Sequence, residues 1–478
     1  MERILSVKQM RSADDFTINK LGIAEEVLVE RAGKCVADEI IRRFPGGRVL
    51  VCIGKGNNGA DGAVVAKILS KHHGFSVNTL TVSNGIFRLF DKKYDIIVDC
   101  IFGTGLNKEV DGKFKVAIEK INSSGAYVVS CDIPSGLNGD NGKVMGIAVK
   151  ANLTIAIQEY KLGHFLGDGV DYCGEVVAKD IGISIWGEDY VKRFNDQAVA
   201  KFFPLRKRNS NKGNFGRACV IGGSLKYSGS VVLSANALCS LKMGVGYTNL
   251  VVPKSLFNAY VGKVPECILT PIQDVDGFVV LDQKTLSSLL SYDCIAIGMG
   301  MGDGVGIYNT IKFLLENYTG KLVIDADGLN SLSKFGVGIL KDKKCEVILT
   351  PHIGEFSRLL GVDKTQILET IIDFAYNFAK EYNVTLLLKN ATSVITNGVE
   401  TYINTTGTPA MAKAGSGDVL SGLLAGLLGR TTETFYATVA GAYIFGKLGE
   451  KAESEQNEYT VTASDLIAVI PKVINDFI

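Results

Sequence analysis

Residues 49–62, VLVCIGKGNNGADG, decide the fold class of this chain. They begin as an apolar strand and pass through a glycine-rich turn into a helix, which is how a parallel α/β unit begins. Gly54, Gly56 and Gly59 match G-x-G-x-x-G, a spacing that lets the backbone approach a phosphate at the helix N-terminus. An NAD-dependent dehydrogenase would also place an acidic residue after the next strand, but that strand ends in residues 82–84, VSN. The dehydrogenase interpretation therefore lacks its ribose contact.

The composition of the whole chain is that of a globular enzyme with two or three domains. Its 478 residues include 51 basic and 50 acidic side chains, a net charge of +1, with 46% apolar and 21% charged residues. This balance excludes bulk disorder and gives no electrostatic reason for a nucleic-acid or membrane partner. We expect small-molecule partners and, because glycine-rich neutral chains of this kind often assemble symmetrically, a homo-oligomer.

The cysteines and the apolar segments indicate the cellular compartment. The ten cysteines are scattered and form no C-x-x-C pair, so we expect free thiols in a reducing cytoplasm rather than disulfides or a zinc site. Residues 1–16 lack the apolar segment of a signal peptide, and residues 419–429 are too short and glycine-rich to span a bilayer. The chain is therefore predicted to be cytoplasmic.

Strand-like and helix-like runs alternate along the chain, which predicts an α/β fold with largely parallel sheets. Strands are predicted at residues 48–53, 75–82, 95–100, 126–131 and 152–157, and then at 218–221, 249–252, 294–297, 322–325, 346–349 and 385–388. Helices are predicted at residues 24–44, from about 62, at 230–242 and, as the final helix, from 417. The crossover at 83–94 is too short for a full helix. The polar, basic segment 202–216 separates two domains, residues 1–203 and 204–478.

Polar loops follow three of the predicted strands in the first domain, at residues 99–105, 132–136 and 161–163. Ligands of open α/β sheets collect at the carboxyl ends of the strands. Asn58, Asp99 and Ser135 supply hard oxygen donors there, suited to an alkali or alkaline-earth cation. Asp132 lies beside the glycine loops and can work as a general acid or base. Alternatively, Asp99 and Asp132 only cap loops through bonds to the backbone.

The motifs NNGADG, DCIFGTG, DIPSG and KLG, in this order, resemble the N-terminal domain of the NAD(P)H-hydrate epimerases. The resemblance implies a Rossmann-like three-layer domain, a potassium ion on Asn58, Asp99 and Ser135, and catalytic roles for Asp132 and Lys161. It implies that NAD(P)H-hydrate is bound by Asn57, Asn58, Gly59, Ala60, Asp61, Gly103, Thr104, Gly105, Leu106, Asn107, Lys108, Glu109 and Asp132. Ala60 departs from the glycine usual in the family and places a methyl group near the expected phosphates. The short crossover at 83–94 is a second departure.

The segment 412–422, AKAGSGDVLSG, carries the chemistry of the second domain. Gly415 and Gly417 permit a turn whose amides converge on an anion at the start of a helix. Asp418 then lies within reach of a hydroxyl beside a bound phosphoryl group and can take its proton during transfer. The alternative is an ordinary aspartate in a first helical turn, favoured by the helix dipole.

Further loops follow strands at residues 298–302, 325–330, 350–355 and 389–393. His352 lies on one of them beside Gly354 and Glu355, and either a ligand contact or a structural role suits it. Asp325 and Asp327 have the same two interpretations, because aspartates in loops also satisfy backbone amides.

The motifs NKGNFG, IGGS, GMGMG, DADGLN, LTPHIGE, LKNATSVI and MAKAGSGDVLSG, in order, resemble the ribokinase-like NAD(P)H-hydrate dehydratases. The resemblance implies that NAD(P)H-hydrate meets Ser230, Gly302, His352 and Asp418, and that Mg²⁺ accompanies the nucleotide. It implies a nucleotide bound by Lys389, Asn390, Ala391, Thr392, Ser393 and Gly417.

Together the two domains resemble the bifunctional NAD(P)H-hydrate repair enzymes. The first half is then expected to interconvert R and S NAD(P)H-hydrate, and the second to dehydrate the S epimer to NAD(P)H with ADP, giving AMP and phosphate. The residues do not separate ADP from ATP as co-substrate, nor NADH-hydrate from NADPH-hydrate. A ribokinase-type small-molecule kinase with a non-enzymatic N-terminal binding module is the alternative.

Overall fold

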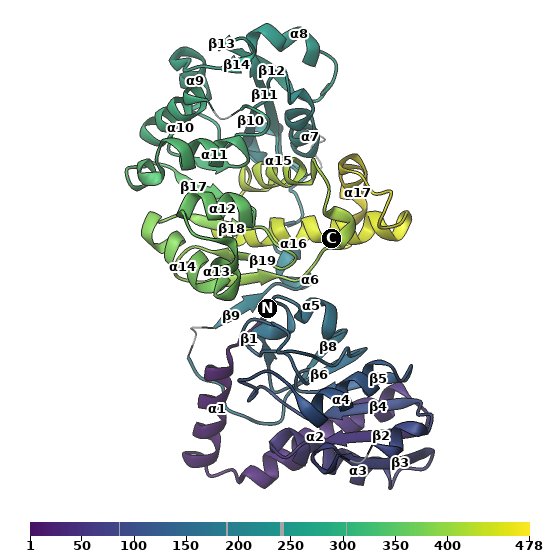
Figure 1. Cartoon of the computed structure of the whole chain (residues 1–478). Helices are drawn as coiled ribbons and strands as arrows, with labels where there is room; N and C mark the ends of the chain where they lie inside the picture. Colours follow the sequence, from purple (N-terminus) through teal and green to yellow (C-terminus); the bar gives the residue numbers. More distant parts are fainter. Residues whose placement is uncertain (86, 188–189, 240–242, 303) are drawn as a thin grey trace. The chain divides into compact units, whose positions relative to one another are not determined.

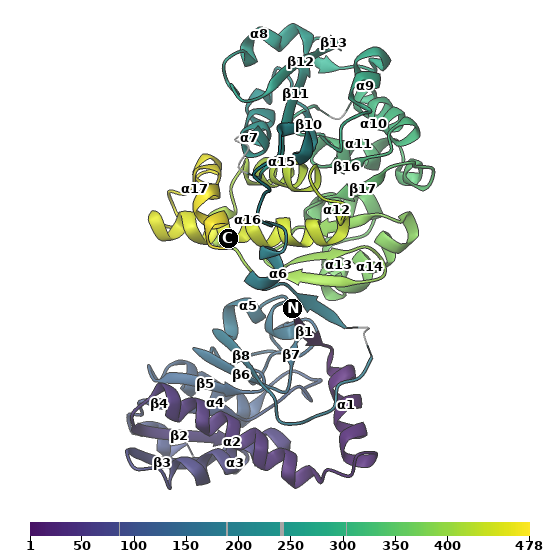
Figure 2. The ribbon, with the colours of Figure 1, turned by 180° about the vertical axis from the view of Figure 1, so that it is seen from behind.

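The computed structural model of the chain describes residues 1–478 except 86, 188–189, 240–242 and 303. The chain forms two compact units (Figures 1 and 2). We name Arg3–Val191 the N-terminal unit, and Met1–Glu2 with Lys192–Ile478 the C-terminal unit. None of the described helices is long and apolar enough to cross a membrane.

A six-stranded, wholly parallel sheet forms the N-terminal unit, in the order β3-β2-β4-β5-β6-β8. The strands are β2 (Gly47–Ile53), β3 (Phe75–Thr81), β4 (Ile96–Cys100), β5 (Tyr127–Cys131), β6 (Leu153–Ile157) and β8 (Glu175–Lys179). The helices are α1 (Val7–Asn19), α2 (Glu25–Arg43), α3 (Asn57–Leu69), α4 (Gly112–Asn122) and α5 (Gly169–Tyr172). A short parallel pair joins β1 (Glu2–Leu5) to β7 (Tyr160–Lys161).

The central strand β2 shows why this sheet carries helices on both faces. Successive side chains of a strand point to opposite faces. Val49 and Val51 pack into the core that α2 and α3 cover, whereas Leu50 and Cys52 pack into the core that α4 covers. All four side chains are fully buried. The predicted Rossmann-like three-layer architecture is confirmed.

The segment after β2 differs from the prediction at one boundary. Helix α3 begins at Asn57 rather than near residue 62, with Gly56 as its N-cap, so the motif NNGADG forms its first turns. The 83–94 crossover holds only the short 3₁₀ turns Val82–Asn84 and Arg88–Asp91 among its described residues, as predicted.

The C-terminal unit contains a ten-strand run in the order β12-β11-β10-β15-β16-β17-β18-β19-β20-β9. Pairing is parallel from β12 to β18 and antiparallel through β19 and β20. Its strands are β9 (Val191–Arg193), β10 (Arg217–Ile221), β11 (Tyr247–Pro253), β12 (Ile268–Ile272), β15 (Cys294–Ile297), β16 (Lys321–Ile324), β17 (Glu346–Leu349), β18 (Thr385–Leu388), β19 (Ser393–Thr396) and β20 (Thr401–Asn404), with a separate hairpin of β13 (Asp274–Val275) and β14 (Phe278–Val279). Its helices are α6 (Asp196–Ala200), α7 (Ser228–Cys239), α8 (Phe257–Tyr260), α9 (Gln283–Leu289), α10 (Val305–Asn317), α11 (Asp327–Phe335), α12 (Ile353–Leu360), α13 (Lys364–Glu369), α14 (Ile371–Tyr382), α15 (Ser416–Leu428), α16 (Thr434–Glu455) and α17 (Ala463–Asn475).

Helix α15 lies in the core, and two further helices, α16 and α17, follow it. The prediction that the helix from 417 is the final one is therefore wrong, because the chain covers α15 with more apolar helix. A Cβ on Gly422 would lie 2.0 Å from the carbonyl oxygen of Ser234, so only glycine allows α15 to pack this closely on α7. The helix predicted at 230–242 is α7, and residues 240–242 lie outside the described part of the chain.

Eight of the described cysteines are free thiols. Cys267 is disulfide-bonded, so the expectation that every cysteine is free is wrong at this position. The residues near Cys267 in sequence carry no spacing that signals a disulfide, since C-x-x-C pairs are absent from the chain.

Candidate active sites

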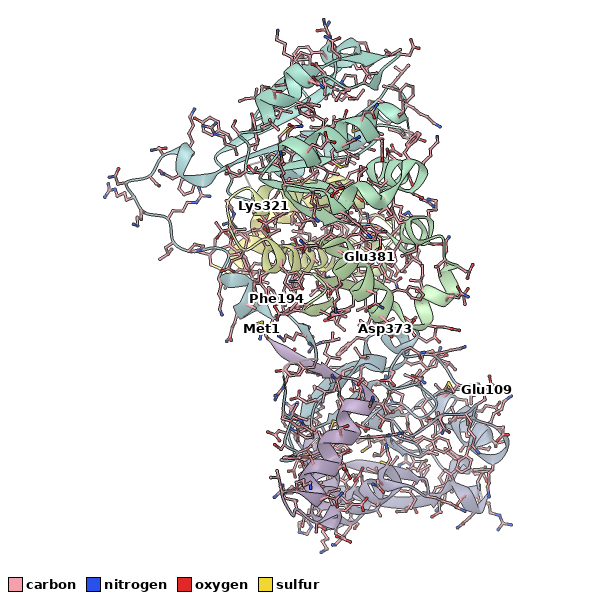
Figure 3. All side chains as sticks on the ribbon, turned by 90° about the vertical axis from the view of Figure 1, so that its left-hand side faces the viewer. Met1, Glu109, Phe194, Lys321, Asp373 and Glu381 are labelled. Atoms are coloured by element: carbon pink, nitrogen blue, oxygen red, sulfur yellow. The ribbon has the colours of Figure 1, made fainter. Side chains whose placement is uncertain are left out.

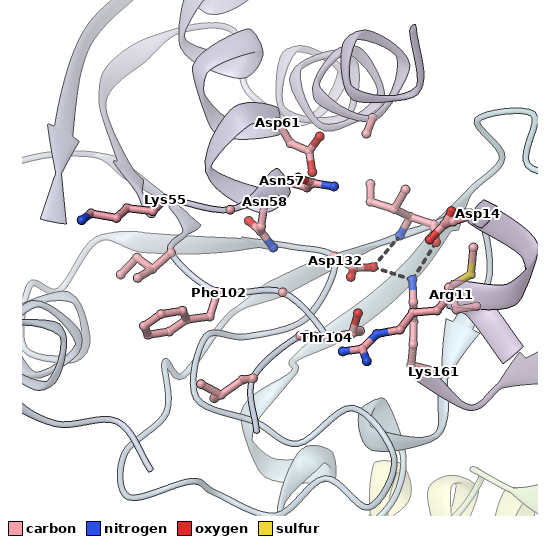
Figure 4. Close-up of a pocket in the computed structure, with 18 of the residues that line it drawn as sticks. Arg11, Asp14, Lys55, Asn57, Asn58, Asp61, Phe102, Thr104, Asp132 and Lys161 are labelled. Atoms are coloured by element: carbon pink, nitrogen blue, oxygen red, sulfur yellow. Dashed lines mark hydrogen bonds and ion pairs between the residues drawn. The ribbon is translucent and has the colours of Figure 1, made fainter. Parts of the chain in front are cut away.

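A cavity of about 720 Å³ opens at the carboxyl ends of the strands of the N-terminal unit (Figure 4). It is lined by the first turns of α3, by the loops after β4 and β5, and by α1. The predicted residues that line it are Asn57, Asn58, Asp61, Gly103, Thr104, Gly105, Leu106, Asn107, Lys108, Glu109, Asp132 and Lys161. Gly59 and Ala60 do not line it, and Ala60 is exposed. The methyl group of Ala60 therefore does not narrow the cavity.

Asp132 has the most constrained geometry in this cavity. Its φ of 66° is in the left-handed region, which costs a non-glycine residue free energy and is found mainly at functional sites. The surroundings hold it: its N–H donates to the carbonyl of Ile155 at 2.8 Å, and its carboxylate forms an ion pair with Lys161. Lys161 is 1% exposed and also donates to the carbonyl of Ile157 at 2.6 Å.

His164 fixes this pair and was missed by the sequence reasoning. Its Nδ1 accepts the backbone N–H of Lys161 at 3.1 Å, so Nε2 carries the proton and donates to the carbonyl of Asp132 at 2.8 Å. One buried imidazole thus ties the backbones of both charged residues together. Its position three residues after Lys161, in KLGH, is the only sequence signal for this role.

Two of the other carboxyl groups that line the cavity have raised pKa values. Burial, with Asp132 and Asp14 nearby, raises the pKa of Asp61 to about 8. Burial also raises the pKa of Asp14 on α1 to about 6, against the opposing effect of Lys161. Asp14 and its neighbour Arg11 were not predicted. Their spacing suits one helix face, and α1 is fixed to the unit by tertiary contacts. The N–H of Val7 donates to Asp140 Oδ1 at 2.7 Å, and Met10 and Ala13 pack into the core.

Of the residues predicted to hold a cation, Asn58 lines the cavity, and Asp99 and Ser135 are hydrogen-bonded to each other. Asn58 donates through Nδ2 to the carbonyl of Cys131 at 2.9 Å, and its buried Oδ1 has no partner among the described residues. Asp99 is fully buried and accepts bonds from Ser130 Oγ, from Ser135 Oγ and N–H, and from the N–H of Ile101, at 2.6–3.3 Å. Burial raises the pKa of Asp99, and these bonds oppose the shift. Asp99 thus makes the bonds to backbone N–H groups that the capping interpretation expects, and the unpartnered Oδ1 of Asn58 is suited to a hard cation.

A second set of polar groups meets at the start of α15 in the C-terminal unit. Lys389, after β18, donates to Asp325 Oδ1 at 2.9 Å, and Ser421 Oγ donates to Asp325 Oδ2 at 2.6 Å. A Cβ on Gly417 would lie 3.5 Å from Lys389 Nζ, so the glycine loop lies directly against this ammonium group. Burial lowers the pKa of Lys389, but the carboxylates of Asp325 and Glu355 raise it by more. The net pKa is therefore above its ordinary value, and the ammonium group is charged.

Asp418 lies beside this pair, in the first turn of α15. Burial and the charge of Asp325 raise its pKa to about 6, while Ser230 on α7 donates a hydrogen bond to its carboxylate. The backbone carbonyl of Asp418 also accepts a bond from Ser234 Oγ at 2.8 Å. The contact between α7 and α15 therefore brings together Ser230 and Asp418, which are distant in sequence.

The remaining predicted residues have local roles that the structure defines. His352 caps α12: its Nδ1 accepts the N–H of Gly354 at 2.9 Å and of Glu355 at 3.2 Å. Burial and Lys389 lower its pKa, so the ring is neutral. Gly302 donates through its N–H to Asp327 Oδ2 at 2.8 Å. Four residues after Lys389 were also predicted to bind the nucleotide. Of these, Asn390 and Ala391 are exposed, Thr392 is buried and Ser393 is half-buried.

The C-terminal unit, with a glycine loop opening a buried helix at the carboxyl edge of a parallel sheet, defines a ribokinase-like fold. An Enterococcus faecalis protein titled as ribokinase-like has the same fold, at a TM-score of 0.52 and 22% identity over 62% of this chain and 98% of that chain. A Bacillus subtilis structure titled ADP/ATP-dependent NAD(P)H-hydrate dehydratase also shares it, at 0.52 and 24%, over 60% of this chain and 99% of that one.

Sequence comparisons cover the whole length. Residues 218–472 match the family described as NAD(P)H-hydrate dehydratase, and residues 25–87 and 85–163 match that described as YjeF-related protein N-terminus. The bifunctional NAD(P)H-hydrate repair enzyme Nnr of Thermofilum pendens is 31% identical over 99% of this chain and 96% of its own length. The enzyme of the same name from Pyrobaculum aerophilum is 33% identical over 100% and 99%. The chain belongs to the family of bifunctional NAD(P)H-hydrate repair enzymes.

Proposed function

We propose that this chain repairs hydrated nicotinamide cofactors in two steps at two separate sites. The N-terminal cavity interconverts R and S NAD(P)H-hydrate, and the C-terminal site dehydrates the S epimer to NAD(P)H with ADP, giving AMP and phosphate. The observation that carries the proposal is that each compact unit holds its own acid–base group: half-buried Asp132 with buried Lys161 in one, and half-buried Asp418 in the other. The domains of this proposal are residues 1–203 and 204–478.

In the dehydratase site, the charged groups suit transfer of a phosphoryl group to the ring hydroxyl. Asp418 accepts the proton of that hydroxyl, and Ser230 orients its carboxylate. Lys389 and the amides at the start of α15 stabilise the charge that develops on the phosphoryl oxygens. We assign the nucleotide to Lys389, Asn390, Ala391, Thr392, Ser393 and Gly417, and the hydrate to Ser230, Gly302, His352 and Asp418.

Mg²⁺ fits this site as an ion carried by the nucleotide. Among the described residues there is no group of three or more His, Cys, Asp or Glu side chains that could hold a metal ion. Mg²⁺ commonly binds through substrate phosphates, water and only one or two carboxylates, which agrees with this donor set. When bound, it neutralises phosphoryl charge.

In the epimerase site, Asp132 and Lys161 are the catalytic pair, and the loops at 57–61 and 103–109 hold the dinucleotide. Glu109 is exposed (Figure 3). We assign a potassium ion to Asn58, Asp99 and Ser135. Two observations support it: the buried Oδ1 of Asn58 has no partner among the described residues, and the buried Asp99 accepts hydrogen bonds from neutral groups. The ion would supply positive charge that orders the ligand phosphates.

The proposal extends to the setting of the enzyme. We place it in the cytoplasm, where the eight free thiols described are stable, as a homo-oligomer that acts on small molecules. The near-neutral charge supports the absence of nucleic-acid and membrane partners.

The test uses a mixture of R and S hydrated NADH with purified protein, potassium and Mg²⁺, and with ADP or ATP in parallel. Recovery of NADH absorbance is followed while chromatography resolves the remaining epimers. Full recovery with one nucleotide supports both activities and identifies the phosphoryl donor. Recovery that stops when the S epimer is exhausted removes the epimerase assignment and leaves a binding module. No recovery with either nucleotide refutes the repair function and favours a small-molecule kinase.

A further inference from the structure

The N-terminal cavity holds more acid–base groups than the catalytic pair requires. Besides Asp132 and Lys161, the side chains of Asp14 and Asp61 line it (Figure 4). Neither carboxyl group has a hydrogen bond or ion pair with any residue that the structure describes, whereas Asp132 has both. Asp61 is only 8% exposed. A buried carboxyl group without a protein partner that faces a ligand cavity is available to the ligand.

We propose that Asp61 is the proton donor of the epimerase site and that Asp14 is a positioning residue that, together with burial and Asp132, favours the protonated form of Asp61. This inference rests on the epimerase function proposed above and assigns its acid. The groups that face Asp61 are the carboxyls of Asp14 on α1 and Asp132 after β5, and the thiols of Cys100 and Cys131 at the ends of β4 and β5. No cation faces Asp61 among these groups, whereas Lys161 faces Asp14 and Asp132. The cavity therefore separates a neutral carboxyl from an ionised one.

The chemistry of the hydrate needs this pair of opposite protonation states. A reduced nicotinamide ring is an enamine, so added water places the hydroxyl on the carbon bonded to the ring nitrogen. Inversion at that carbon begins when Asp61 gives its proton to the hydroxyl. The C–O bond breaks, water departs with the bonding electrons, and the nitrogen lone pair forms a C=N bond.

The second half restores the hydrate in the other configuration. Water adds to the opposite face, the C=N π electrons return to nitrogen, and the proton lost by that water goes to the Asp132 carboxylate. Water in the cavity then carries the proton from Asp132 back to Asp61. No atom or electron is gained or lost over the cycle, so the site needs neither nucleotide nor redox partner.

The proposal also explains an aspartate in a stretch assigned to phosphate binding. An ionised carboxylate beside a ligand phosphate is repulsive, whereas a neutral carboxyl group is not, and its one proton remains available for the ring hydroxyl. The burial of Asp61 and its acidic neighbours both favour that neutral form, with a pKa of about 8. Its place at the fifth position of α3 directs it into the same cavity as Asp132.

The experiment uses the full chain and purified S-hydrated NADH without any nucleotide, so that only epimer exchange is measured. Appearance of the R epimer is followed by chromatography. We expect Asp61→Asn to lower kcat for exchange at least about 100-fold, with KM changed less than about threefold, because a proton donor is lost. Asp61→Glu keeps a carboxylic acid at this position, so its kcat for exchange should exceed that of the Asn variant at least about tenfold. Dehydration of the S epimer with ADP checks that each variant is folded in its other unit.

The pH profile separates this role from a structural one. Wild-type exchange should fall about tenfold per pH unit above about pH 8, and Asp14→Asn should move this fall to lower pH, since it removes a negative neighbour. Asp15→Asn is the matched control: Asp15 adjoins Asp14 but is exposed and does not line the cavity. An Asp61→Asn variant within threefold of wild type, or one that keeps the alkaline fall, overturns the inference. A wild type that does not exchange the epimers refutes the proposed function itself.

Discussion

Asp418 gives the sharpest prediction about the dehydratase site. If its carboxylate takes the proton of the ring hydroxyl, Asp418→Asn removes the base and should lower kcat for S-epimer dehydration about 10²–10⁴-fold. The pKa of about 6 adds a second expectation. About nine-tenths of the side chains are ionised at pH 7 and about one-tenth at pH 5, so the wild-type rate should fall about tenfold over that interval. An unperturbed aspartate, with a pKa near 3.8, would show almost no change there.

The assay follows NADH absorbance from purified S-hydrate at saturating ADP, with an enzyme-free blank at each pH. Asp373→Asn is the matched control, because Asp373 is also the third residue of a helix, α14, but is exposed on the surface (Figure 3). If the only role of Asp418 is a favourable interaction with the helix dipole, both variants should lose no more than about 1 kcal/mol of stability and keep full activity. That result, or a wild-type rate independent of pH between 5 and 7, would refute the reasoning.

Three further changes test other parts of the chain. Lys389→Met leaves the buried Asp325 carboxylate without its cation. Dehydration should fall about 100-fold and the C-terminal unit should lose about 3 kcal/mol in urea unfolding, while unchanged stability would contradict this. Gly103→Ala places a Cβ 3.1 Å from Asn58 Nδ2 and 3.6 Å from Asp132 Oδ2. Epimer exchange should fall about tenfold with dehydration unaffected, and equal loss of both would point to misfolding. Glu39 is buried beside Arg42, Arg43 and Lys179, and Arg42 above all lowers its pKa to about 2 although burial opposes this. Glu39→Gln should cost about 2 kcal/mol in unfolding at pH 7, a difference that disappears as pH falls from about 4.5 toward 2.

The strands and the loops at their ends were predictable from the sequence because short buried strands leave a strong local signal. Val49–Cys52 alternate between two cores, and both faces of a covered parallel strand must be apolar. Once strands are placed, the α/β rule gathers their following loops at one edge, which is how Asn58, Asp99 and Asp132 were identified as neighbours. The glycine loop before Asp418 was predictable for the same reason.

The contacts that could not be predicted are those made by tertiary packing. Nothing local shows that Ser230 reaches Asp418, because that contact depends on α7 and α15 packing closely at Gly422. Asp14 belongs to a helix that the sequence pattern did not mark, and His164 acts through backbone groups rather than through a motif. The prediction that the helix from 417 is the last one failed for a related reason. The apolar faces of α16 and α17 help to bury α15 but carry no motif that sequence reasoning could recognise.

The two sites share one backbone device that sequence reasoning passes over. Asp132 has a φ of 66°, and Ala326, which lies between Asp325 and Asp327, has a φ of 48°. Both follow the carboxyl end of a parallel strand, where glycine would adopt this conformation at no steric cost. At both positions, hydrogen bonds from the surroundings stabilise a conformation that is unfavourable for a residue with a side chain. His164 and Ile155 bond to the backbone of Asp132, and Lys389 and Ser421 bond to the carboxylate of Asp325 beside Ala326. The backbone conformation that these residues prefer locally therefore differs from the one they adopt in the fold. The difference occurs next to the charged groups of both sites, where the strained backbone fixes the direction of a carboxylate.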